Sequence, residues 1–103
     1  MIALVFRYDA RDTEEFERVY GADGEWAQFF RRGAGYIGTE LLRDVDEHDR
    51  YLVIDRWDSA DAYNAFLAAH GDEYLRRSDD ARFYYVHELR MGTFATPGTW
   101  FAL

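Results

Sequence analysis

Hydrophobic and polar residues alternate along four stretches of the chain, as they do in strands that bury one face. The stretches are residues 2–8, 35–44, 50–58 and 82–94. In the first stretch, Ile2, Leu4, Phe6 and Tyr8 fall on one face, and Arg7 falls on the other. The second and third stretches are joined by the polar segment VDEHD, which predicts an antiparallel hairpin.

Two other stretches carry apolar residues at helical spacing. Asp12 or Thr13 can cap a first helix, and Asp58 or Ser59 can cap a second. We expect Gly71 to interrupt the second helix, with DEYLRR continuing it at a new angle. The apolar positions are Phe16, Val19 and Tyr20 in the first helix, and Tyr63, Phe66, Leu67 and His70 in the second.

The segment YGADGEW, residues 20–26, places two glycines and an aspartate inside the first helical pattern. An uninterrupted helix would put Asp23 at the centre of the apolar stripe, where an unpaired carboxylate is costly. We therefore expect a break in which Gly21 adopts the left-handed conformation and Asp23 caps a new segment near Gly24. Such a break either directs Trp26 to the mouth of a pocket or only keeps the helix wrapped on the sheet.

The order β-α-β-β-α-β predicts an α+β, ferredoxin-like domain, with a four-stranded antiparallel sheet and both helices on one face. We expect this domain to span residues 1–94. Because the other face has no helix to cover it, we expect two copies to pair sheet against sheet as a homodimer. Residues 95–103 form a tail whose apolar side chains either pack on the partner subunit or hang free.

Composition narrows the classes of function. The formal net charge of -8 disfavours nucleic-acid and membrane-surface partners, because the average surface repels anions. The chain has no cysteine and no histidine pair with metal-ligand spacing, so we expect neither a metal nor a cofactor. The apolar N-terminal stretch is too short for a signal peptide or membrane span, which predicts a cytoplasmic location. Aromatic residues make up 18% of the chain, which favours a pocket or interface lined by rings.

The segments GYIGTELLRD and RYLVIDRWDSADAYNAFLAAH resemble the antibiotic biosynthesis monooxygenase domain. The resemblance implies a dimeric α+β barrel built from ferredoxin-like subunits. Family members oxidise aromatic polyketide phenols without a prosthetic group, act on quinols, or degrade haem. The resemblance is carried by Gly35, Gly38, Glu40, Arg50, Tyr51, Arg56, Trp57, Ser59 and Ala62.

The haem-degrading branch of that family uses an Asn on the first strand, a Trp on the second helix and a His about ten positions later. The corresponding positions here hold Phe6, Arg7 or Tyr8 on the strand, Phe66 on the helix, and Arg76. None of the three matches, so the resemblance does not extend to haem degradation by that mechanism. The favoured function is a cofactor-independent monooxygenase for a small aromatic, phenolic or quinol-like compound, and the alternative is a non-catalytic dimeric binding protein.

Candidate site residues come from the helix stripes and the strands. His70 is the candidate catalytic acid or base because it titrates near neutral pH, although a histidine near a helix end can simply bond a free carbonyl. His87 can face either the pocket or the dimer interface. Arg7 can bind an anionic substrate group or pair with a carboxylate such as Asp55 or Glu88. The residues expected to contact the aromatic substrate are Trp26, Phe30, Tyr63, Phe66, Tyr74, His87 and Arg7.

Overall fold

The computed structural model, which describes residues 1–97, has the predicted order of strands and helices, with the first helix divided in two. The last predicted strand begins later than residue 82, because Arg82–Tyr84 form a 3-10 turn. The elements are β1 (Ile2–Ala10), α1 (Thr13–Tyr20), α2 (Glu25–Phe30), β2 (Tyr36–Arg43), β3 (Arg50–Trp57), α3 (Ala60–Ala81) and β4 (Tyr85–Ala95).

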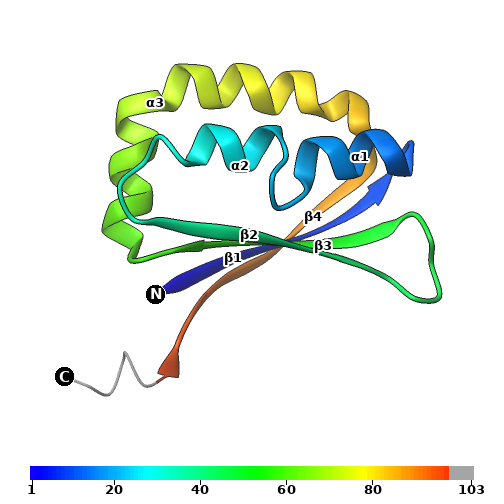
Figure 1. Ribbon diagram of the computed structural model, residues 1–103, viewed down its shortest axis with the longest axis horizontal. Helices are drawn as coiled ribbons and strands as arrows, with labels where there is room; N and C mark the ends of the chain where they lie inside the picture. Colours follow the sequence, from blue (N-terminus) through cyan, green and yellow to red (C-terminus); the bar gives the residue numbers. More distant parts are fainter. Residues whose placement is uncertain (98–103) are drawn as a thin grey trace.

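The four strands form one antiparallel sheet in the order β2-β3-β1-β4. All three helices lie on the same side of this sheet, with α3 outermost (Figure 1). The hairpin predicted between the second and third strands is present, with Leu42 opposite Leu52. The ferredoxin-like α+β fold expected from the pattern is therefore confirmed.

Alternation along the two central strands divides the sheet into a helix-covered face and a helix-free face. On β3, Tyr51, Val53, Asp55 and Trp57 are buried under the helices, while the residues between them are half-buried on the other side. Edge strand β4 departs from simple alternation, because its register against β1 shifts twice. As a result Tyr85 lies opposite Ala10 on the helix-covered face, whereas His87 lies opposite Asp9 on the helix-free face.

The break in the first helix is present, but its details differ from the prediction. Gly21 is extended, with φ of -68°, and is not left-handed. Gly24 precedes α2 without a side-chain cap, and a Cβ there would lie 2.6 Å from the carbonyl oxygen of Val19. Asp23 does not cap α2, because its Oδ1 instead accepts a hydrogen bond from Arg31 at 2.8 Å. The close approach of two backbone segments explains why the chain requires glycine here.

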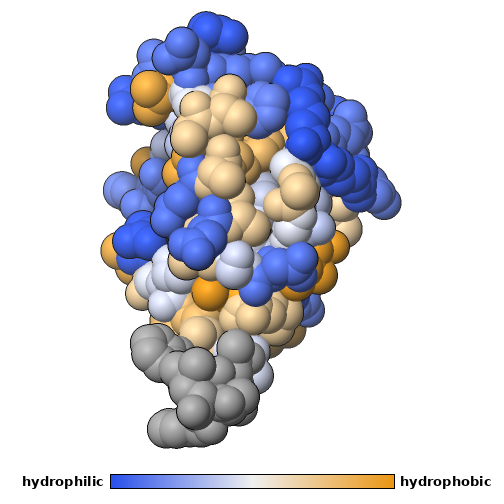
Figure 2. Space-filling model, turned by 90° about the vertical axis from the view of Figure 1, so that its left-hand side faces the viewer, coloured by the Kyte–Doolittle hydropathy of each residue, from blue (hydrophilic) through white to orange (hydrophobic). Residues whose placement is uncertain are grey.

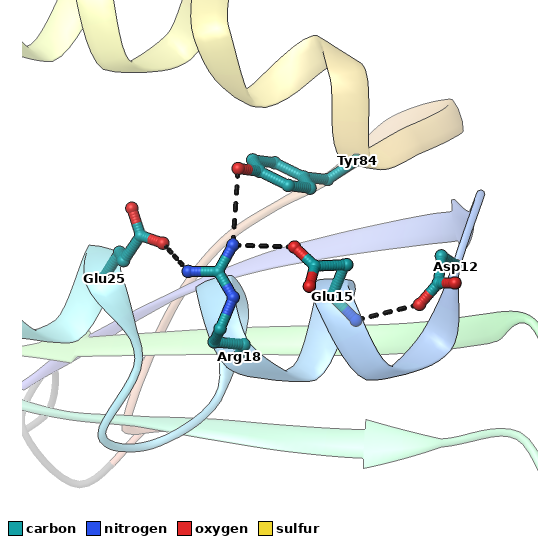
Figure 3. Close-up of polar contacts among 5 residues, drawn as sticks. All are labelled: Asp12, Glu15, Arg18, Glu25 and Tyr84. Carbon is teal, nitrogen blue, oxygen red and sulfur yellow. Dashed lines mark hydrogen bonds and ion pairs between the residues drawn. The ribbon is translucent and has the colours of Figure 1, made fainter.

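The guanidinium of Arg18 connects the two halves across this break (Figure 3). Arg18 pairs with Glu25 at the start of α2 and, at 2.8 Å, with Glu15 on its own helix. It also donates to the hydroxyl of Tyr84 at 3.5 Å, while Asp12 caps α1 by accepting from the amide of Glu15 at 3.0 Å. These groups are exposed, so their ion pairs contribute little to the free energy of unfolding. Their main effect is to orient α2 relative to α1.

Helix α3 bends at the position where the sequence predicted an interruption. Ser59 caps it by accepting from the amide of Ala62 at 3.0 Å. His70, next to Gly71, has non-helical dihedral angles of -124° and 19°, and the second half of the helix turns to run across the other two helices (Figure 1). Figure 2 shows the end of the molecule where the first half of α3 lies, with apolar surface between hydrophilic residues.

Candidate functional site

A cavity of about 290 Å³ lies between the helices and the sheet. Every helix and three of the four strands contribute to it, so it is a product of the whole fold. Its floor is formed by Phe6 and Tyr8 of β1 together with Val53 and Asp55 of β3. The rest of its lining is Tyr20, Trp26, Phe30, Tyr74, Leu75, Ser78, Asp79, Arg82, Tyr85 and Glu88.

Aromatic rings form the walls of the cavity, and Trp26 is at their centre. Its ring centroid lies 5.5 Å from Phe30, 5.6 Å from Tyr74 and 6.4 Å from Tyr20. The helix break brings Trp26 to this position, because α2 starts immediately before it. Rings held at these spacings offer flat apolar surfaces to an aromatic ligand.

One carboxyl group, that of Asp55, lies among these apolar walls. Its side chain is buried, with 9% of the residue exposed, and its Oδ1 accepts a hydrogen bond from Thr39 Oγ1 at 2.6 Å. Thr39 Oγ1 is in turn 2.5 Å from the hydroxyl of Tyr36. Burial raises the pKa of Asp55 to about 6, although the Thr39 bond opposes that rise. Within residues 1–97 no cation forms an ion pair with Asp55.

The β4 side of the cavity carries a second carboxylate that already has a partner. Glu88 accepts a hydrogen bond from the hydroxyl of Tyr8 at 2.6 Å. Burial, together with the neighbouring Tyr20 and Glu88, raises the pKa of Tyr8 well above its usual value, so this phenol stays neutral. Arg82 and Asp79, 3.7 Å apart, add an exposed pair to the lining.

The structure brings together three of the predicted ligand-binding residues, Trp26, Phe30 and Tyr74, in the lining of this cavity. Phe66 is buried behind the wall, with its ring centroid 5.6 Å from that of Phe30. Tyr63 is half-buried beside the ring of Trp57, at a centroid distance of 5.5 Å. Both therefore support the lining residues and do not themselves line the cavity.

The other predicted site residues lie elsewhere. His70 sits at the bend of α3, with its ring 4.8 Å from Phe66, and faces a separate hollow formed by residues 68–73 and 76. Arg7 and His87 are on the helix-free face, so the predicted pairing of Arg7 with Asp55 or Glu88 does not form, because both carboxylates are on the other side of the sheet. Catalysis by His70 stays a prediction, and the geometry gives it no direct contact with the cavity.

The groups that sequence reasoning missed are Asp55 as a cavity residue and the hydroxyls of Thr39 and Tyr36. The signal was nevertheless present in the third predicted strand. Asp55 follows Tyr51 and Val53 at the same alternation and precedes Trp57, so the pattern places a carboxyl on the face that packs under the helices. A charged residue at a buried strand position requires a reason, because burial disfavours its charged form.

Comparison with known proteins places the chain in a family. Residues 1–77 match the antibiotic biosynthesis monooxygenase domain. The chain belongs to the antibiotic biosynthesis monooxygenase family. No curated protein matches the sequence of this chain.

Several solved structures share the fold over nearly the whole chain. SnoaB from Streptomyces nogalater, described as a cofactor-independent oxygenase, is 28% identical, with a TM-score of 0.72 over 92% of this chain and 91% of its own. A Deinococcus radiodurans protein named for the same family has a TM-score of 0.70 at 15% identity, covering 93% of this chain and 92% of its own. The protein PA3566 from Pseudomonas aeruginosa has a TM-score of 0.62 at 17% identity, covering 92% of each chain.

Two further observations concern the described residues of this family member. Within residues 1–97, no group of three or more His, Asp or Glu side chains is placed to hold a metal ion. Across the same residues, no helix is long and apolar enough to span a membrane.

Proposed function

We propose that the protein is a cofactor-independent monooxygenase that oxidises a small aromatic, phenolic or quinol-like compound in the cavity beneath α3. The observation that carries this proposal is an aromatic-walled cavity with a buried carboxyl on its floor. The similarity to SnoaB, described as a cofactor-independent oxygenase, supports it. At about 290 Å³, the cavity is at the small end of ligand sites, which favours a compact ring system.

The proposed chemistry needs no external reductant, because the substrate supplies the electrons. When a ring methylene becomes a carbonyl, it loses four electrons and two hydrogens to one O₂. One oxygen atom enters the product and the other leaves as water, together with the two hydrogens. The protein's part is to hold the ring against the aromatic walls, which include Trp26 and Phe30, to exclude bulk water, and to favour the electron-rich anion of the substrate.

We also propose that two chains pair through the helix-free face of the sheet. This face exposes apolar side chains that include Leu42, Leu89, Met91 and Phe94. A contiguous apolar surface of this kind is usually covered in solution. The division into a domain of residues 1–94 and a tail of 95–103 belongs to the same proposal, and residues 98–103 of that tail lie outside the described residues.

Oxygen uptake tests the proposal directly. We expect the purified protein to consume O₂ with at least one anthrone, naphthol or quinol from a broad panel. Trp26→Ala should weaken the apparent affinity for that substrate about tenfold, which corresponds to about 1.4 kcal/mol of lost ring contact. The matched control is Phe83→Ala, since Phe83 is 69% exposed and lies outside the cavity lining.

The outcomes separate the proposal from its alternative. Saturable binding of aromatic compounds, without oxygen uptake for any member of the panel, would identify a non-catalytic binding protein. Absence of both binding and uptake would reject the cavity as the site. His70→Ala belongs in the same series, because a strong loss of uptake would restore the predicted role of this histidine despite its separate position.

A further inference from the structure

Asp55 has one occupied and one available oxygen. Its Oδ1 accepts from Thr39 Oγ1, whereas no described residue donates a hydrogen bond to Oδ2. Asp55 lines the cavity, so a ligand hydroxyl in the cavity is the partner that this second oxygen lacks.

The hydrogen bonds behind Asp55 have a defined direction while it is ionised. A threonine hydroxyl carries one hydrogen, and Thr39 gives its hydrogen to the Asp55 carboxylate at 2.6 Å. The contact between Tyr36 and Thr39, at 2.5 Å, must therefore be donated by the phenol of Tyr36. Both hydroxyls thus point their hydrogens toward the carboxylate, and each stabilises its negative charge.

We propose that Asp55 is the base that removes the proton from a hydroxyl group of an aromatic substrate, and that Thr39 and Tyr36 are its positioning residues. The O–H bond of the substrate breaks, its electron pair stays on the substrate oxygen, and the proton moves to Oδ2 of Asp55. The resulting phenolate donates four electrons to O₂: one ring C–H becomes a carbonyl, the phenolate oxygen becomes the second carbonyl of a quinone, and the other oxygen atom leaves as water with the ring hydrogen and the proton held by Asp55. This inference rests on the proposed function and narrows its substrate class to neutral hydroxylated aromatic compounds, since a base can act only on a substrate that still carries its hydroxyl proton.

Burial of Asp55 in the cavity floor raises its pKa to about 6, so its charge changes between pH 4 and 8. The phenols around it come from every packed layer: Tyr8, Tyr20, Tyr36, Tyr63, Tyr74 and Tyr85. Burial raises the pKa of Tyr8, Tyr20, Tyr36, Tyr63 and Tyr85 above the usual value, so these phenols stay neutral over that range. The charged neighbours are Glu88 and Arg90 on β4, with Asp79 and Arg82 at the end of α3.

A titration of the Asp55 side-chain carboxyl, followed by ¹³C NMR in the full chain, tests the hydrogen-bonded arrangement without any substrate. Thr39→Val keeps the volume but removes the donor, and should move the midpoint upward by about one pH unit. Tyr36→Phe should move it in the same direction by less. Glu14→Gln, at an exposed position of α1 outside the cavity lining, is the control and should leave the Asp55 midpoint in place. An unchanged midpoint in Thr39→Val would overturn the positioning role.

Ligand binding tests the contact between Asp55 and the substrate hydroxyl, again without turnover. We expect the wild-type chain to bind 2-naphthol about tenfold more tightly than its methyl ether, which lacks the donor, because one hydrogen bond to a charged group is worth about that factor. Asp55→Leu should remove the preference while both compounds still bind. If the preference persists in Asp55→Leu, the hydroxyl does not meet Asp55 and the assignment is rejected.

Turnover provides the third measurement. With a substrate that consumes O₂, Asp55→Asn should lower kcat by about 100-fold or more while KM changes little. The acid limb of the kcat/KM profile, which reports the free protein, should shift in Thr39→Val by the amount seen in the NMR titration. Full activity in Asp55→Asn would reject Asp55 as base and leave the oxygenase proposal standing. Absence of turnover with an intact naphthol preference would reject the oxygenase instead.

Discussion

Alternation of side chains along the strands gives the two faces of the sheet different compositions. The helix-covered face packs aromatic rings from strands and helices into two buried clusters and leaves a cavity with one buried carboxyl between them. The helix-free face carries aliphatic side chains that stay half-exposed, together with Arg7 and His87. Apolar burial on the helix-covered face therefore stabilises the fold. The helix-free face keeps exposed apolar side chains, which is the surface proposed to contact a second chain.

The two faces differ most in the surroundings of their charged side chains. Charged groups of the free face remain near water, and Arg50 and Arg56 have carboxylate partners within 3.1 Å. Asp55, on the covered face, instead accepts a hydrogen bond from the neutral hydroxyl of Thr39. Burial of a carboxylate without a cationic partner costs free energy, so the position of Asp55 is a candidate for function.

Truncation of Trp57 is the strongest test of the covered face. This side chain is fully buried, at 0% exposure, and contacts the rings of Phe30, Tyr63 and Phe66. We expect Trp57→Ala to lower the free energy of unfolding by about 3–5 kcal/mol, measured by urea denaturation.

Trp57→Phe serves as the matched variant for that measurement. Within residues 1–97 the indole Nε1 has no hydrogen-bond partner, so Phe removes a buried donor while keeping an aromatic ring. It should cost clearly less than Trp57→Ala. Equal losses in the two variants would show that the aromatic packing at this position is not what holds the covered face.

The dependence of stability on pH tests the buried carboxyl. Burial raises the pKa of folded Asp55 from 3.8 to about 6, so the folded state binds this proton more tightly than the unfolded state. Its contribution to stability is complete below the unfolded pKa and is lost as pH rises through about 6. Asp55→Asn does not titrate, so its stability relative to wild type should improve by roughly 2–3 kcal/mol between pH 3.5 and 7.5.

Urea denaturation across that pH range measures the effect. Phe83→Ala, at an exposed position outside the cavity lining, changes no titrating group and gives a control whose difference from wild type should stay nearly constant. A constant difference for Asp55→Asn as well would mean that Asp55 is solvated in the folded protein.

Local features of this fold could be predicted from the sequence, whereas features that depend on register could not. The Ser59 cap and the bend beside Gly71 follow from short-range geometry, and both were expected within a residue. The face of His87 relative to Tyr85 depends on the register shift opposite Asp9 and Ala10, which the side-chain pattern of β4 does not mark. The separation of His70 from the cavity follows from the bend itself, because a helix that changes direction no longer keeps one continuous stripe.

The free face should respond in the opposite way to the covered one. Leu89 is half-exposed, at 52%, and lies opposite Arg7. We expect Leu89→Ser to change the stability of the isolated chain by only about 0.5 kcal/mol, because little further surface becomes wet. The same change should weaken self-association, measured by sedimentation velocity, since the side chain belongs to the face proposed to pair. Wild-type stability should fall on dilution through the dissociation range, while that of Leu89→Ser should depend less on concentration. A wild-type chain that sediments as a monomer at every concentration would show that this face stays uncovered in solution.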